Sequence, residues 1–227
     1  MRGLHLRNEY YLQYIKGQNE RTLTLHMLKL QKEKIRVVRK FEQRQMGAVP
    51  NLSVEDLNII QHYRWYLDDT LLALANLGQN YTLNQTEQKA RLFQEKIPEI
   101  SRLCFYIGGY LGGIEKYEVE INRDKARMTY SLSDTNSIPP FILMEPDYLC
   151  KEVFFHFVES IYMGEWKQEY EHTQKNVRRL SNTLWGVEVS YADKSEKISF
   201  SGFNAFPYNF NQFLHFFESY KKKVYTI

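Results

Sequence analysis

The sequence has few cysteines and no long hydrophobic run. Cys104 and Cys150 are the only two cysteines in 227 residues, and their spacing fits no metal or redox motif. We interpret them as reduced thiols and not as part of a disulfide scaffold, and a single disulfide between them is the alternative. No apolar stretch reaches the roughly 18 residues of a membrane span. The first residues, MRGLHLRNEYYLQ, lack the apolar segment and cleavage site of a secretory signal. We therefore expect a cytoplasmic protein without membrane contact.

Motifs for catalysis, metal binding and nucleotide binding are also missing. The six histidines have neither H-E-x-x-H nor H-x-H spacing, and no G-x-S-x-G occurs. The run GGYLGG (108–113) precedes an alternating segment instead of a helix with Lys-Ser/Thr, which favours a hairpin turn over a phosphate loop. His62, Tyr66 and Asp69 share one helix face, but zinc takes three or four protein ligands, which favours a packing role. The sequence predicts no catalytic residue, metal or cofactor.

The N-terminal region, residues 1–99, is predicted to be helical because proline and glycine are rare between its apolar-periodic segments. Ser53 followed by Asp56 resembles a capping box, and Gly78 is a stop signal. The predicted helices are one long or two shorter helices over 8–46 with a break at Gly17, one from Ser53 to Gly78, and one over 84–97 that Pro98 ends or kinks.

Positive charge is concentrated in this region. Residues 1–48 carry eleven Lys/Arg against four Asp/Glu, whereas the net charge of the whole chain is only +3. In LTLHMLKLQKEKIRVVRKFEQ (23–43) the apolar residues fall on one arc of a helix, and basic residues fall on the opposite arc. Several cations on one face are what phosphate binding requires, although a solvated face of an amphipathic helix is the commoner explanation. The candidate binding residues are Lys29, Lys32, Arg36, Arg39 and Lys40.

The remaining part, residues 100–227, is predicted to be an α+β module. Its segments LCFYIGG, KYEVEI, ARMTYSLS, LWGVEVSY and KISFSG alternate or are rich in β-formers, and turn residues separate them. DYLCKEVFFHFVESIYMGEW and NFNQFLHFFESYKKK have helical periods. We expect an α+β fold in which a helical region accompanies an antiparallel sheet of about five strands, with two helices covering one sheet face.

Residues 102–220 resemble a family of uncharacterised bacterial proteins. The pattern consists of W-x-x-x-Y after a helix, a strand that begins with Trp and ends with Tyr, a charged turn, and a G-x-N-A-aromatic-P-x-N-aromatic corner before an amphipathic helix. The resemblance implies a fold and brings no activity and no catalytic residue. The matching positions are Trp166, Tyr170, Trp185, Tyr191, Gly202, Asn204, Ala205, Phe206, Pro207, Asn209 and Phe210.

The corner SGFNAFPYNF (201–210) has two interpretations. Glycine, asparagine and proline are turn residues, and Asn209 is placed to cap the helix that follows. This favours a strand-to-helix corner plugged by aromatic side chains. The alternative is a ligand or peptide site at Asn204, Phe206 and Asn209.

The leading functional hypothesis is a non-enzymatic binding or regulatory protein. Its basic N-terminal helix would contact nucleic acid, a nucleoprotein or an acidic protein surface, as an inhibitor or accessory factor would. One alternative is an interaction module or homodimer that uses exposed aromatics at Tyr63, Trp65 and Tyr66. Another is an enzyme whose dispersed site involves His62 or His156 and carboxylates.

Overall fold

The computed structural model describes residues 5–44, 49–109, 113–133, 141–142, 147–171, 183–193 and 197–224. The chain divides into two compact units. The helical unit comprises Met1–Gln45 and Pro50–Asn84, and the sheet unit comprises Met46–Val49 and Gln85–Ile227. The third predicted helix, expected to belong to the N-terminal helical region of residues 1–99, is thus part of the sheet unit.

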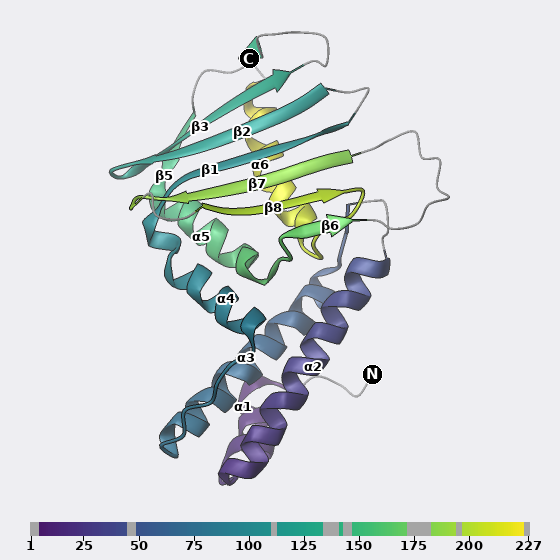
Figure 1. Cartoon of the computed structure of the whole chain (residues 1–227), viewed down its shortest axis with the longest axis vertical. Helices are drawn as coiled ribbons and strands as arrows, with labels where there is room; N and C mark the ends of the chain where they lie inside the picture. Colours follow the sequence, from purple (N-terminus) through teal and green to yellow (C-terminus); the bar gives the residue numbers. More distant parts are fainter. Residues whose placement is uncertain are drawn as a thin grey trace. The chain divides into compact units, whose positions relative to one another are not determined.

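Two long helices dominate the helical unit (Figure 1). The second ends just before Gly78, as the sequence indicates, and the predicted end of the first at Gly47 lies outside the described residues. Gly17 interrupts the first predicted segment with a φ of +74°, a conformation that costs glycine little. The Ser53 side chain accepts a hydrogen bond from the Asp56 amide at 3.1 Å and caps the next helix, as predicted. The elements are α1 (Arg7–Tyr10), the π-helical turn η1 (Tyr11–Ile15), α2 (Glu20–Arg44) and α3 (Val54–Asn76).

A single mixed sheet forms the centre of the sheet unit. Seven strands follow one another in the order β4-β3-β2-β1-β7-β8-β6, and β5 also pairs with β3. All described pairings are antiparallel except that of β6 with β8. The α+β class is as predicted, but the sheet has more strands than the expected five. Its strands are β1 (Ile100–Gly109), β2 (Gly113–Asn122), β3 (Lys125–Ser133), β4 (Phe141–Ile142), β5 (Asp147–Cys150), β6 (Glu169–Glu171), β7 (Thr183–Tyr191) and β8 (Lys197–Phe203).

The hairpin predictions hold where the structure describes them. In GGYLGG, Gly109 pairs with Gly113 across the β1–β2 hairpin, whose tip lies outside the described residues. Asn122 pairs with Lys125, so Arg123 and Asp124 form the predicted turn between β2 and β3. The tip of the turn between β7 and β8 lies outside the described residues.

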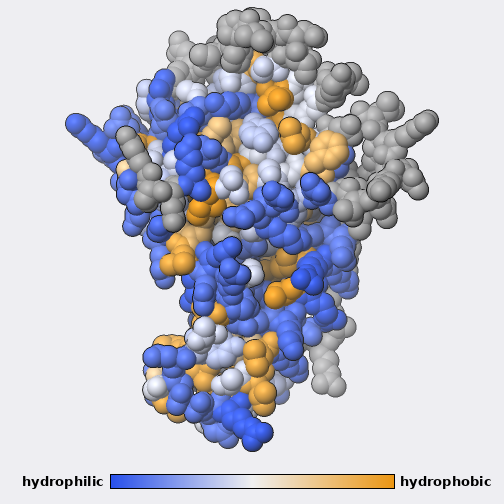
Figure 2. All heavy atoms as spheres, in the orientation of Figure 1, coloured by the Kyte–Doolittle hydropathy of each residue, from blue (hydrophilic) through white to orange (hydrophobic). Residues whose placement is uncertain are grey.

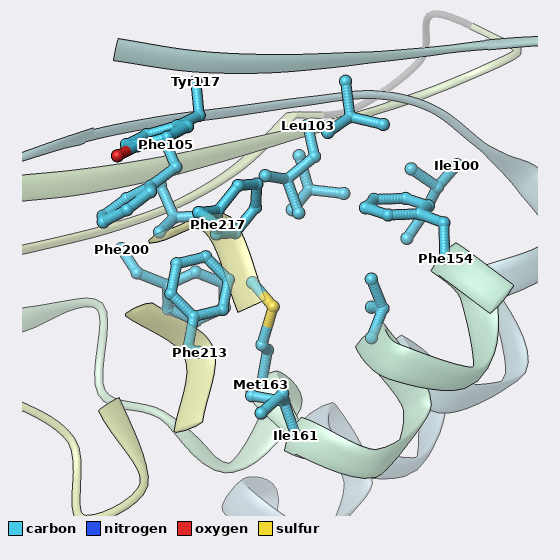
Figure 3. Packing of buried hydrophobic residues seen from close by; sticks show 14 of the residues in the cluster. Ile100, Leu103, Phe105, Tyr117, Phe154, Ile161, Met163, Phe200, Phe213 and Phe217 are labelled. Atoms are coloured by element: carbon cyan, nitrogen blue, oxygen red, sulfur yellow. The ribbon is translucent and has the colours of Figure 1, made fainter. Parts of the chain in front are cut away.

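Helices α5 (Lys151–Ile161) and α6 (Phe210–Val224) cover one face of the sheet, as expected, and α4 (Gln85–Glu95) adds a third helix to the same core. Aromatic side chains from the sheet and from α6 meet edge to face, for example Phe105 and Phe213 with ring centroids 4.9 Å apart. Figure 3 shows these side chains converging from the strands and the helices. Burying this many large apolar groups is the main stabilising term of the unit. Its most buried members include Leu103, Phe105, Val119, Phe154, Trp185, Phe210, Phe213 and Phe217.

Candidate functional site

The predicted basic residues of α2 lie on one exposed face of a continuous helix. Lys29, Lys32, Arg36, Arg39 and Lys40 are all exposed, and together they define the basic face of α2. From the first to the last, eleven residues at 1.5 Å each span about 17 Å along the axis. The opposite face of α2 is buried, as the apolar period predicts, through Leu23, Met27, Leu30, Val37 and Phe41.

Most of the positive charge on the basic face of α2 is not neutralised by the neighbouring carboxylates that the structure describes. Arg36 pairs with Glu33 one turn away, with Nη2 and Oε2 2.6 Å apart. The other four cations form no ion pair within the part of the chain that the structure describes. An exposed i,i+3 pair contributes only about 0.3–0.5 kcal/mol, so Arg36 can exchange Glu33 for a stronger anion.

Two leucines lie beside these cations. Leu25 and Leu28 are 60% and 43% exposed, and at 100° per residue they share the arc of Lys29 and Lys32. Figure 2 shows hydrophobic side chains among hydrophilic ones on the visible face of the molecule. The exposed arc of α2 therefore offers apolar contact as well as positive charge.

Behind the basic face, three segments bring aromatic rings together. Tyr10 of α1 stacks on Tyr66 of α3 with ring centroids 3.5 Å apart, and Tyr14 of η1 stacks on His26 of α2 at 5.8 Å. The Tyr10 hydroxyl contacts His26 Nε2, and the Tyr66 hydroxyl donates to the His5 carbonyl at 2.6 Å. Burial raises the pKa of Tyr10. Sequence reasoning misses this cluster because its members come from three separate segments with no common spacing.

The surroundings of His26 predict that the stability of the helical unit depends on pH. Burial, and then the positive charge of Lys29, lower the pKa of His26 below its usual value of about 6.5. The unfolded chain then binds the proton more readily, so the free energy of unfolding should fall as pH drops below about 6.5. In His26→Gln, this part of the pH dependence should disappear, which urea unfolding between acid and neutral pH would measure. An unchanged slope would contradict the assignment.

In the part of the chain that the structure describes, the other histidine candidates form no cluster with two or more carboxylates. His62 Nδ1 bonds the Asn58 carbonyl at 2.7 Å, and the Asp69 carboxylate accepts hydrogen bonds from the Arg7 guanidinium, the shortest at 2.6 Å. His156 lies 3.8 Å from Glu159 on the surface of α5. Among the described residues, no group of three or more His, Cys, Asp or Glu could hold a metal ion.

The aromatics proposed for a homodimer are less exposed than that alternative assumes. Tyr66 is buried in the ring cluster, so its predicted exposure is wrong. Tyr63 and Trp65 are partly buried, and the Arg7 guanidinium lies 5.9 Å from the centroid of the Trp65 ring.

In the corner at 201–210, polar groups form hydrogen bonds to the neighbouring strand β7, between β8 and the start of α6. Asn204 has a φ of 51°, and its side chain accepts a bond from the Thr183 amide at 2.8 Å. The Trp185 indole donates to the Ala205 carbonyl, also at 2.8 Å. Phe206 is buried, with its ring 5.0 Å from that of Phe210. Such contacts are those of a strand-to-helix corner.

Asn209 differs from its predicted role. Only 4% of it is exposed, its side-chain oxygen accepts from the Trp166 indole at 2.8 Å, and its amide nitrogen donates to the Ile161 carbonyl. The predicted side-chain cap of α6 is therefore wrong, because this side chain links α6 to the end of α5 and the segment after it. Two hydrogen bonds thus join residues that carry the sequence resemblance, Trp166 with Asn209 and Trp185 with Ala205.

No protein-family model, curated protein or solved structure matches this chain. Of the helices that the structure describes, none combines the length and apolar character needed to cross a membrane.

Proposed function

We propose that this chain is a non-enzymatic binding protein whose basic face of α2 contacts nucleic acid. One observation carries the proposal: Lys29, Lys32, Arg39 and Lys40 are exposed on one helix face and form no ion pair with described residues. A row of about 17 Å can meet several phosphates of one nucleic-acid backbone, and each neutralised phosphate releases counterions. The exposed leucines beside the row would contact sugars or unstacked bases.

The cytoplasm is the compartment that we propose for this activity. Both cysteines are free in the structure, as reduced thiols would be. An acidic protein surface is the second partner with the same charge requirement, and a competition experiment separates the two.

Charge reversal of the basic face is the direct test. Lys29→Glu, Lys32→Glu, Arg36→Glu and Arg39→Glu, combined in the full chain, should weaken binding to labelled random-sequence oligonucleotides at least tenfold. The slope of log Kd against log salt should fall by about 0.9 for each duplex phosphate that the variant no longer neutralises. Fluorescence anisotropy over a salt series measures both quantities.

The matched control places four reversals of the same sign elsewhere, at Lys89, Lys125, Lys151 and Lys167. This control should keep wild-type affinity and salt slope. Absence of oligonucleotide binding at low salt, or equal slopes for the two variants, would refute the nucleic-acid proposal. If the chain binds polyglutamate but no oligonucleotide, the partner of the basic face is an acidic protein surface.

A further inference from the structure

A cavity opens in the sheet unit between α4 and the beginning of β8. Its volume is about 630 Å³, within the roughly 300–1,000 Å³ of protein ligand sites. The floor is aromatic: the rings of Phe93 and Trp166 lie 6.3 and 5.6 Å from that of Phe200, all edge to face. Leu92 and Ile198 are also among the lining residues. The cavity can therefore accept a large apolar side chain.

Among the described residues, no strand pairs with the outer backbone groups of β8 beside this cavity. Within the described residues, β6 pairs with β8 only from Ser201 onward, and the Ser201 amide donates outward to the Gln168 carbonyl at 2.9 Å. Backbone groups of alternate residues point to the same side of a strand, so Lys197 and Ser199 direct theirs outward as well. Ser199 is exposed. This short edge offers hydrogen bonds to an added strand.

Positive charge flanks the same cavity. Lys89 and Lys96 line it from α4 and the residue that follows this helix, and the Lys96 ammonium lies 5.3 Å from the centroid of the Tyr191 ring. No Asp or Glu is among the described residues that line the cavity. Lys197 also lines it, but its ammonium is held by Glu188 at 2.9 Å. Lys89 thus favours an anionic occupant, and Lys96, which has contacts of its own, adds positive charge on the same side.

We propose that an extended acidic peptide of a partner protein binds here by adding a strand to the outer edge of β8. One large apolar side chain of the peptide fills the cavity over Trp166 and Phe200, and its neighbouring carboxylates meet Lys89 and Lys96. Main-chain hydrogen bonds to Ser199 supply affinity, and the pocket supplies specificity. The inference is independent of the basic face of α2, because it rests on different residues in the other unit.

Selection from a displayed library of random peptides against the full chain tests the specificity. Enriched peptides should share an aromatic residue or leucine flanked by Asp or Glu. Combined Lys89→Glu and Lys96→Glu should weaken the best peptide at least tenfold in fluorescence anisotropy. Lys125→Glu with Lys151→Glu is the matched control and should leave its affinity unchanged.

Backbone methylation of the selected peptide tests the added strand. N-methylation of alternate peptide amides should weaken binding about tenfold or more, and the intervening amides should tolerate it, because only every second amide faces β8. Ser199→Pro removes the outward N–H and should weaken binding similarly, since an edge strand accepts proline. Unfolding curves check that this variant folds.

Three results would overturn the proposal. They are a library that yields no enriched peptide, enriched peptides without acidic residues, and N-methylation effects without a period of two. The last result would show a pocket that binds side chains without strand addition. The Lys89/Lys96 variant should still bind oligonucleotides, which would show that its loss of peptide binding is independent of the basic face of α2.

Discussion

Gly202→Ala should destabilise the sheet unit by about 4 kcal/mol. Gly202 is paired with Trp185 on β7 and with Tyr170 on β6, so the Trp185 indole lies across it. A Cβ there would lie 2.5 Å from the indole Nε1 and 2.6 Å from the Ala205 carbonyl oxygen. Overpacking costs about 1–3 kcal/mol, and losing the buried indole hydrogen bond adds a similar amount. Urea unfolding monitored by tryptophan fluorescence measures the change.

Gly186→Ala is the matched control in the neighbouring strand. Its Cβ would meet Cζ and Oη of Tyr106 at 2.4 and 2.5 Å, which is as close as the contacts at Gly202. These atoms are at the far end of a flexible side chain, and the ring can rotate away for about 1 kcal/mol. Equal losses in the two variants would contradict the role given to the fixed Trp185 indole.

The helices could be predicted because their boundaries are local. Gly17, Ser53 and Gly78 act through their own backbone conformation or a hydrogen bond three residues away, and the structure places them at the breaks and caps that the sequence indicates. The apolar period of α2 likewise identifies its buried face, so the exposure of its basic face follows from the sequence alone.

The additional strands could not be predicted because they are short and depend on distant partners. DYLC (147–150) fits the helical period of the segment after it, but the structure pairs it with β3 as β5, and α5 begins at Lys151. β4 has two residues and β6 has three, too few for alternation to show. Tertiary pairing decides such segments, since β-propensity depends on context.

The two candidate sites also differ in whether they depend on local sequence or on tertiary contacts. The basic face of α2 repeats along one helix and is visible in the sequence. The cavity beside β8 combines α4, the segment around Trp166 and two strands, and no spacing rule connects them. The edge beside it, which no described strand covers, also depends on where the pairing of β6 with β8 begins, at Ser201. A site made by tertiary contacts between separate elements needs coordinates to be found.

Asn209→Leu should also cost about 4 kcal/mol, although leucine is of broadly similar size to asparagine and is more apolar. The substitution leaves the Trp166 indole N–H and the Ile161 carbonyl without the side-chain partner that now bonds both. Each buried polar group left unsatisfied costs about 1–3 kcal/mol. Gln212→Leu, on the exposed side of α6, is the control and should change the free energy of unfolding by less than about 0.5 kcal/mol.

A double-mutant cycle with Trp166→Phe assigns this cost to the bond between the two side chains. Phenylalanine keeps an aromatic ring beside Phe200 and Phe213 but has no N–H to satisfy. In that background Asn209→Leu should cost about 1–2 kcal/mol less, because only the Ile161 carbonyl loses its side-chain partner. Strict additivity would mean that the indole finds another acceptor in the single variant. The stability of the corner would then not depend on the bond between Asn209 and the Trp166 indole.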